Sequence, residues 1–204
     1  MRKAILGAVG AALMCSCPLA MAQDFGSQGT VTLSAERVFG LHYTHTRIEV
    51  NGGPADGDVS HSDVTTFGIG WYRSETAFNN PRAAADFFVI DRLSLGGSLG
   101  FYLWGDDGDL QGLIFAPRVG YAAPLSDAIS IWPRGGLTFL SEEADDTDYT
   151  QFALSGECMF AFFPQETWAI LAGPTLDLGL TGDREDDDFS QYSFGIHAGI
   201  MGVL

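Results

Sequence analysis

The chain has 204 residues, among them 26 glycines, and aromatic side chains make up 12% of it. This composition favours an all-β protein with tight turns, because glycine destabilises helix interiors. The formal net charge of −16 excludes binding to nucleic acids or to anionic surfaces through bulk electrostatics. The length suits a single domain.

The first 22 residues have the pattern of a cleaved secretory signal peptide. A basic start at Arg2 and Lys3 precedes an apolar stretch, and "AMA" forms a cleavage site before Gln23. We therefore expect a signal peptide at 1–22, a single domain at 23–204 and an exported protein. Export leaves 26 acidic residues against eight arginines, a charge of −18. The residues before Cys15 and Cys17 lack the small side chains that favour lipid attachment at either cysteine.

The rest of the chain predicts eight strands in an up-and-down meander, because segments with period-2 alternation are separated by turns of two kinds. Three short turns ("VIDRLS", "PLSDA", "PQET") are strictly interleaved with four acidic loops ("NGGPADGDVSHSD", "GDDGD", "SEEADDTD", "GDREDDD"). The expected strands are 30–50, 63–90, 93–104, 110–123, 128–140, 149–163, 167–181 and 189–204. Within the second strand, residues 73–82 ("RSETAFNNPR") predict a bulge, a bend or a short helical insertion.

The alternation within the strands predicts a barrel that is apolar outside. One face carries large apolar side chains, and the other carries mainly glycine, serine, alanine and threonine, which suits a narrow interior. No stretch has the roughly 18 consecutive apolar residues of a transmembrane helix, so membrane insertion would be by strands. Aromatic side chains are expected at both interfaces: Tyr121, Phe162 and Trp168 near the short turns, and Tyr43, Phe101 and Phe139 near the acidic loops.

The whole mature chain resembles the outer membrane protein β-barrel domain family, which has the small eight-stranded OmpA/OmpX-like architecture. The resemblance rests on "LSAERVFGLHYT", "ADFFVIDRLSLGGSLGFY", "PRVGYAAPLSDAISIWPRGG" and the last strand, "YSFGIHAGIMGVL". It implies an outer-membrane location with short periplasmic turns and no shared catalytic motif. The last strand departs from the family's assembly signal, since Leu204 stands where an aromatic residue is typical.

The same alternation places six charged residues inside the barrel. His42 and His197 lie close to these inward-facing positions in the alternation. Such a small barrel has an interior that side chains just fill, so buried charges must pair or be hydrated. We expect Arg118 and Arg134 to bridge to Glu157, Glu36 or Asp177, as a static closure of the lumen or as a gate. The six lumen residues are Glu36, Asp86, Arg118, Arg134, Glu157 and Asp177.

The acidic loops are weak candidates for divalent cations. Dense carboxylates suit Ca²⁺ or Mg²⁺, and cations at an outer surface can bridge lipopolysaccharide phosphates. No loop has an EF-hand pattern, so a solvated rim is the simpler interpretation. The candidates are Asp145, Asp146, Asp148, Asp183, Asp186 and Asp187.

Other reactive side chains give little support for chemistry, and we expect no cofactor. Ser98 in "GGSLG" matches the hydrolase motif G-x-S-x-G but lies in the middle of a predicted strand without the required turn and helix. His42 and His197 could form a metal pair but lack a third ligand. Cys158 is expected to face lipid as a small hydrophobe.

Two features do not fit regular alternation. Arg37 has outward parity, so we expect either a bulge over 36–38 or a side chain that reaches the periplasmic interface. Pro117, Pro133 and Pro174 lie inside strands, where each lacks a ladder donor, and we expect bulges there.

Three functions remain open. The first is a non-enzymatic outer-membrane barrel with a structural role or with surface interactions through its loops. Such a barrel would be a monomer in contact with lipid and lipopolysaccharide. The second is a narrow or gated pore for ions or small solutes. The third is a soluble periplasmic, lipocalin-like ligand binder.

Overall fold

The computed structural model describes residues 25–50, 57–71, 77–104, 110–144, 147–184 and 187–204. These residues form ten strands and one short 3₁₀ helix. The elements are β1 (Val31–Glu49), β2 (Val59–Ile69), η3 (Ala77–Asn79), β3 (Arg82–Ile90), β4 (Leu93–Trp104), β5 (Leu110–Tyr121), β6 (Ala123–Ser126), β7 (Ile129–Ala144), β8 (Thr147–Gln165), β9 (Trp168–Arg184) and β10 (Asp187–Val203).

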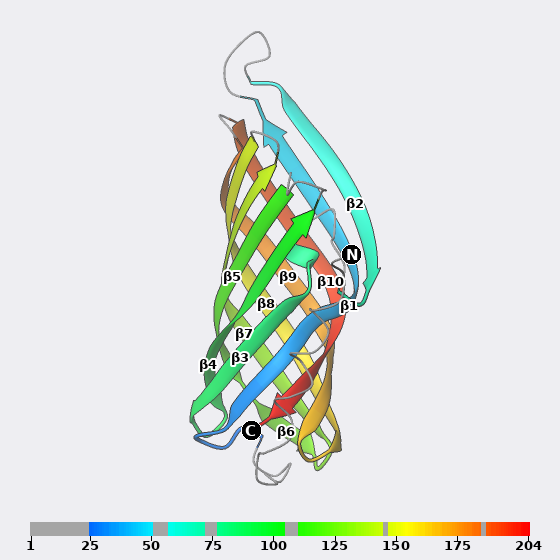
Figure 1. The fold of residues 1–204 in the computed structure, drawn as a ribbon, viewed down its shortest axis with the longest axis vertical. Coiled ribbons are helices and arrows are strands. Elements are labelled where there is room, and N and C mark those ends of the chain that lie inside the picture. The colour runs from blue at the N-terminus through cyan, green and yellow to red at the C-terminus, as the bar shows by residue number, and fades with distance from the viewer. Residues whose placement is uncertain (1–24, 51–56, 72–76, 105–109, 145–146, 185–186) are drawn as a thin grey trace, which may run out of the picture.

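Eight of the strands form a closed antiparallel ring (Figure 1). The order is β1, β3, β4, β5, β7, β8, β9 and β10, and pairing of β10 with β1 closes the ring. β6 continues the line of β5 along β7 in the same register. The expected eight-stranded up-and-down barrel is confirmed. Closure matters because it gives each backbone group in the wall a partner without water.

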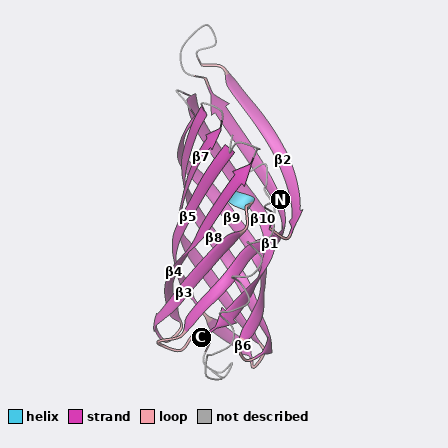
Figure 2. Cartoon of the chain, viewed as in Figure 1, coloured by secondary structure: helices cyan, strands magenta, loops and turns pink. Residues whose placement is uncertain are grey.

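The second expected strand, 63–90, is divided into β2 and β3. β3 pairs with the first part of β1, from Val31 to Glu36, and β2 pairs with the second part, from Phe39 to Glu49. Between them lies η3, the short helix drawn in cyan in Figure 2. Its residue Phe78 is fully buried, so the insertion turns inward. A short helical insertion within one strand position, one of the three expected forms, is therefore what the chain adopts.

The wall is apolar outside and small or polar inside, as the alternation predicted. On β8, Phe152, Leu154, Phe160 and Phe162 are exposed, whereas Met159 and its inward neighbours are buried. The exposed apolar side chains form a band around the barrel, and the outward side chains of β1 show where this band ends. Phe39, Leu41 and Tyr43 are followed by His45, Arg47 and Glu49, so the apolar band ends near Tyr43.

An apolar core fills the barrel at the end with the short turns. It contains Phe88, Ala122, Trp132, Met159, Ala161, Phe163, Ala169, Leu171, Met201 and Val203. Phe25, which precedes β1, packs its ring against Phe88 and Trp132 with centroid distances of 5.3 and 5.4 Å. The amide of Gly29 donates to the carbonyl of Phe88 at 2.8 Å. The segment before β1 therefore folds under the barrel and covers this end.

At the opposite end, the strands run further than expected. β7 and β8 extend to Ala144 and Thr147, and β9 and β10 extend to Arg184 and Asp187. The expected boundaries at 140, 149, 181 and 189 were therefore too short, because acidic residues that predict loops continue the ladders as exposed hairpins. β2 likewise begins at Val59, within the expected first loop.

The expectation of bulges at the prolines was wrong. Register is unchanged across Pro117, Pro133 and Pro174. Pairing instead lapses on one side of each: Pro117 toward β7, Pro133 between the β5 and β6 ladders, and Pro174 toward β8. A missing N–H is thus accommodated by a local gap in one ladder, without an inserted residue.

Candidate functional site

A network of ion pairs crosses the lumen above the apolar core. The structure brings the six sequence-predicted residues into this region and adds Arg37 and Arg82, which the sequence analysis did not select. Their side chains come from six strands, so the network ties distant parts of the wall together. Its members are Glu36, Arg37, Arg82, Asp86, Arg118, Arg134, Glu157 and Asp177.

Arg118 on β5 holds two carboxylates at once. Its NH1 and NH2 groups donate to Glu36 at 2.7 and 2.9 Å. Its Nε and NH2 groups donate to Asp86 at 3.0 and 2.5 Å. Paired donors of this kind fix geometry as well as charge, because the guanidinium fork matches a carboxylate.

Arg134 on β7 joins the first carboxylate to a third. It lies 2.6 Å from Glu36 and 2.5 Å from Glu157. Its guanidinium also stands over the ring of Trp132, 4.6 Å from the centroid, and Trp132 belongs to the apolar core. Trp132 therefore separates the charged layer from the apolar one, with its Nε1 donating to Ser94 at 3.2 Å.

Arg37 enters the network because β1 carries an irregularity. The register between β1 and β10 shifts between Ala35 and Phe39, and Arg37 has a φ of 56°. The shift turns Arg37 inward, where it is 1% exposed and donates to Asp177 at 2.9 Å and Glu157 at 3.2 Å. The bulge proposed over 36–38 is present. Asp177 is therefore a partner of Arg37, whereas Arg118 and Arg134 pair with Glu36, Asp86 and Glu157.

Arg82 is the fourth buried arginine, and sequence reasoning did not select it. It lies at the start of β3, directly after the η3 insertion, and is 3% exposed. Its NH2 donates to the carbonyl of Phe78 at 2.7 Å, and Arg37 donates to the same carbonyl. The inserted turn is thus anchored by two arginines from different strands. Its inward parity, shared with Asp86 four residues later on β3, is the sequence signal that could have found it.

Formal charge is balanced among the eight network residues, which are four arginines and four carboxylates. Three of the arginines form ion pairs with these carboxylates, whereas the hydrogen bond recorded for Arg82 goes to the carbonyl of Phe78. A buried charge that loses its partner costs several kcal/mol, whereas a complete network can be neutral or favourable. The ion pairs therefore help to hold the wall strands in one register.

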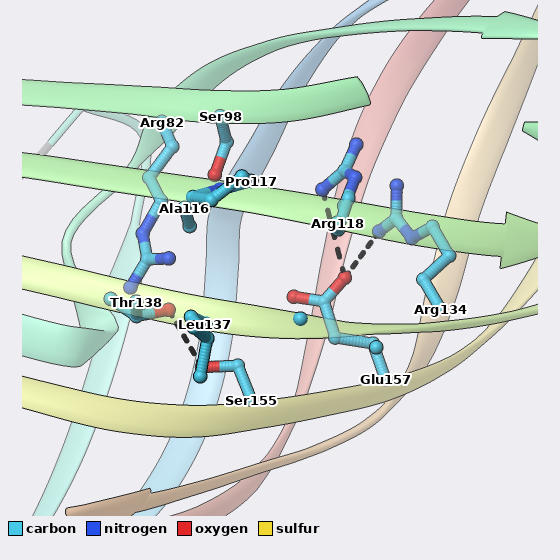
Figure 3. Close-up of a pocket in the computed structure, with 12 residues that line it drawn as sticks. Arg82, Ser98, Ala116, Pro117, Arg118, Arg134, Leu137, Thr138, Ser155 and Glu157 are labelled. Carbon is cyan, nitrogen blue, oxygen red and sulfur yellow. Dashed lines mark hydrogen bonds and ion pairs between the residues drawn. The ribbon is translucent and has the colours of Figure 1, made fainter. Parts of the chain in front are cut away.

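A small cavity borders the network (Figure 3). It measures about 20 Å³ and is lined by both charged and small side chains, including Ser98, Thr138 and Ser155. In the close-up, Arg118 and Arg134 approach Glu157 together, while Arg82 lies at the other side. The volume has room for one or two waters.

His42 and His197 lie beside the network on β1 and β10. Their rings stack with centroids 6.4 Å apart, and the side chains are 1% and 0% exposed. His197 Nε2 is 3.6 Å from Glu157. The structure thus brings the two histidines together, but within the described residues no group of three or more metal-ligating side chains converges.

The remaining sequence candidates are not part of the network, and several lie outside the described residues. Ser98 is buried in the middle of β4 and faces the lumen. Cys158 is a free, half-buried cysteine. Asp145, Asp146 and Asp186 lie outside the described residues, as do the side chains of Asp148 and Asp183, whereas Asp187 begins β10.

Comparison with solved structures supplies the context of this barrel. Neisserial surface protein A superimposes with a TM-score of 0.53 and 12% identity, over 86% of this chain and 99% of that chain. AlkL, an outer membrane protein solved in DMPC lipid bilayers, gives a TM-score of 0.53 and 12% identity, over 93% and 94%. The chain has the fold of small outer-membrane β-barrels.

More distant likenesses add nothing about activity. The outer membrane protease OmpT from Escherichia coli overlaps with a TM-score of 0.43 and 8% identity, over 92% of this chain and 99% of that chain. No protein-family model and no curated protein matches the chain. In the part of the chain that the structure describes, no helix is long and apolar enough to cross a membrane. The exposed apolar band of this barrel faces lipid, and the ion pairs lie inside it.

Proposed function

We propose that residues 1–22 are a cleaved signal peptide and that residues 23–204 form an integral outer-membrane barrel with a structural or surface-interaction role. The barrel performs no enzymatic reaction, and its lumen is closed by the ion-pair network. Its interactions with other molecules take place at the acidic loop end, which faces the exterior. The short-turn end, which Phe25 covers, faces the periplasm.

The filled lumen is the observation that carries this proposal. An apolar core occupies the periplasmic end, the neutral network lies above it, and η3 enters the barrel beside the network. The cavity bordering the network is about 20 Å³, which is too small for a hydrated solute. A gated pore would require several ion pairs and the apolar layer to rearrange together.

A catalytic role has little support in the described residues. Ser98 lies in a regular strand with a buried hydroxyl, without the sharp turn that a nucleophile elbow requires. The acidic residues of the network are engaged by arginines, so none is positioned as a free general base toward an accessible site.

The partners that we propose follow from the outer surface. The apolar band contacts lipid, and the acidic loop end contacts lipopolysaccharide, where Ca²⁺ or Mg²⁺ can bridge carboxylates to phosphates. The lipid-facing exterior disfavours the soluble lipocalin-like alternative, because that class hides its apolar side chains inside. We propose a monomer, since the ring closes on itself and needs no second copy to complete it.

Outer-membrane fractionation combined with liposome swelling tests this function. The protein should appear in the outer-membrane fraction and migrate in a heat-modifiable way on gels. Liposomes containing it should swell in small sugars no faster than protein-free liposomes, while a general porin in a parallel sample swells them rapidly. A swelling rate near that of the porin would contradict a closed lumen.

A further inference from the structure

A cluster of imidazole, phenol and carboxylate groups lies on the outer face of the barrel, just beyond the aromatic end of the apolar band. It involves β1, β2 and β10, and it is separate from the lumen network because its side chains have outward parity. His45 pairs with Asp63 across the β1–β2 ladder, and His61 lies two residues away on β2, opposite Arg47. Tyr43 and Tyr192 complete the cluster.

Asp63 fixes the tautomer of His45. Its Oδ1 accepts a hydrogen bond from the Tyr43 hydroxyl at 2.6 Å and lies 2.7 Å from His45 Nδ1. An ionised carboxylate can only accept, so His45 Nδ1 carries the proton and the lone pair of neutral His45 resides on Nε2.

The ring of His45 is held between two neighbours. Tyr192 stacks on it with a centroid distance of 4.9 Å and an interplanar angle of 27°. His61 lies on another side at 5.4 Å and 31°. His45 is 24% exposed, and His61 is exposed to solvent. The pair therefore places two imidazoles at close range, with the ring of His45 oriented by Asp63 and that of His61 exposed to solvent.

We propose that His45 and His61 bind one borderline transition-metal ion, such as Zn²⁺ or Cu²⁺, at the outer surface. The ligands are His45 Nε2 and a ring nitrogen of His61, and Asp63 is a positioning residue that orients His45. A carboxylate hydrogen-bonded to the remote nitrogen of a ligating histidine is the usual outer-shell partner in metal sites. Because no third ligating side chain converges in the described residues, water completes the coordination.

The chemistry of the pair separates it from the other cation candidates. Imidazole nitrogen suits Zn²⁺, Cu²⁺ and Ni²⁺, whereas the carboxylates of the acidic loops suit Ca²⁺ and Mg²⁺. The net negative charge of the protein raises the local concentration of cations near this surface. The lumen pair, His42 and His197, is closed to solvent at 1% and 0% exposure and has no entry path for an ion.

Calorimetric titration of the untagged, detergent-solubilised barrel with Zn²⁺ tests the site. Millimolar Ca²⁺ is present throughout to occupy carboxylate sites. The wild-type barrel should bind one Zn²⁺, and its Cu²⁺ complex should give an electron paramagnetic resonance spectrum with nitrogen coupling. His61→Gln should weaken binding by more than tenfold. Asp63→Asn should weaken it about tenfold, because the orienting hydrogen bond changes.

Thr65→Gln, an exposed change on the same face of β2, is the matched control and should bind as the wild type does. Heat-modifiable migration verifies that each variant is folded. His61 is exposed, so its substitution is not expected to disturb folding. The proposal is overturned if the wild-type barrel shows no Zn²⁺ binding in the presence of Ca²⁺, or if His61→Gln binds Zn²⁺ equally well.

Discussion

The lumen network and the acidic rim contain the same kinds of side chain in opposite surroundings. Glu157 is 10% exposed and lies within 4 Å of three arginines. Glu143 at the loop end is exposed and accepts a hydrogen bond from neutral Gln111 at 2.5 Å. Charges attract strongly only where water is excluded, so the first carboxylate contributes to the fold and the second to solubility.

The difference explains how a strongly acidic chain forms a barrel. The eight network residues are formally neutral together, whereas most of the acidic excess belongs to the exposed loop end. Each buried carboxylate therefore has an arginine partner, and the unpaired ones stay in water. The four predictions below test this contrast, in order of decreasing effect on the free energy of unfolding.

The largest effect is expected for Glu157→Gln. This change removes the negative charge shared by Arg37 and Arg134 and leaves two buried cations short of a partner. We expect a loss of about 3–5 kcal/mol in the free energy of unfolding. Urea titration in lipid vesicles, followed by tryptophan fluorescence, measures it. A loss below about 1 kcal/mol would mean that water already screens the network.

An intermediate effect is expected for Phe25→Ala. Phe25 packs edge-on against Phe88 and Trp132 but is only partly buried, so we expect a loss of about 2 kcal/mol. The same vesicle titration applies. Gln28→Ala, in the same segment and exposed, is the control, and equal losses for the two variants would contradict a specific role for the aromatic contact.

A smaller difference separates two substitutions at Arg37. Both Arg37→Ala and Arg37→Gly remove the contacts with Asp177 and Glu157, but only alanine is strained at a φ of 56°. Arg37→Gly should therefore be more stable than Arg37→Ala by about 1 kcal/mol. Parallel titrations of the two variants measure the difference. The reverse order would show that the left-handed bulge is lost together with the arginine.

The smallest effect is expected at the rim. Glu143→Gln should change the free energy of unfolding by no more than about 0.5 kcal/mol, because the carboxylate is exposed and its hydrogen bond involves a neutral amide. The titration is repeated at low and high salt. A loss similar to that of Glu157→Gln would remove the distinction between rim and lumen.

Regular alternation was sufficient to predict the barrel and six of the network residues. Arg118, Arg134 and Glu157 lie in strands whose register is unchanged, so a period of two fixes the face of every side chain there. Arg37 could not be placed in this way, because it lies at a register shift. Arg82 has the same parity as Asp86 on β3, so alternation also turns it inward, although the sequence analysis did not select it.

The ends of the strands were also beyond local sequence reasoning. Acidic residues near 141–148 and 182–188 favour loops by composition, yet the hairpins extend to Ala144 and Arg184. Cross-strand pairing continues there because a ladder that has already formed extends readily, even outside the apolar band. The prediction of bulges at the prolines was wrong for a related reason. A strand tolerates a gap in the pairing on one side when the pairing on its other side continues.

Planar-bilayer recording of the wild-type barrel beside Arg134→Ala tests the central claim most directly. Arg134 lies 2.6 Å from Glu36 and 2.5 Å from Glu157, so its removal opens the network but leaves the apolar core below it intact. A lumen closed by both layers predicts no discrete current steps from either protein. Steps from the wild-type barrel whose size or frequency changes in Arg134→Ala would contradict it, because they would make the network a gate.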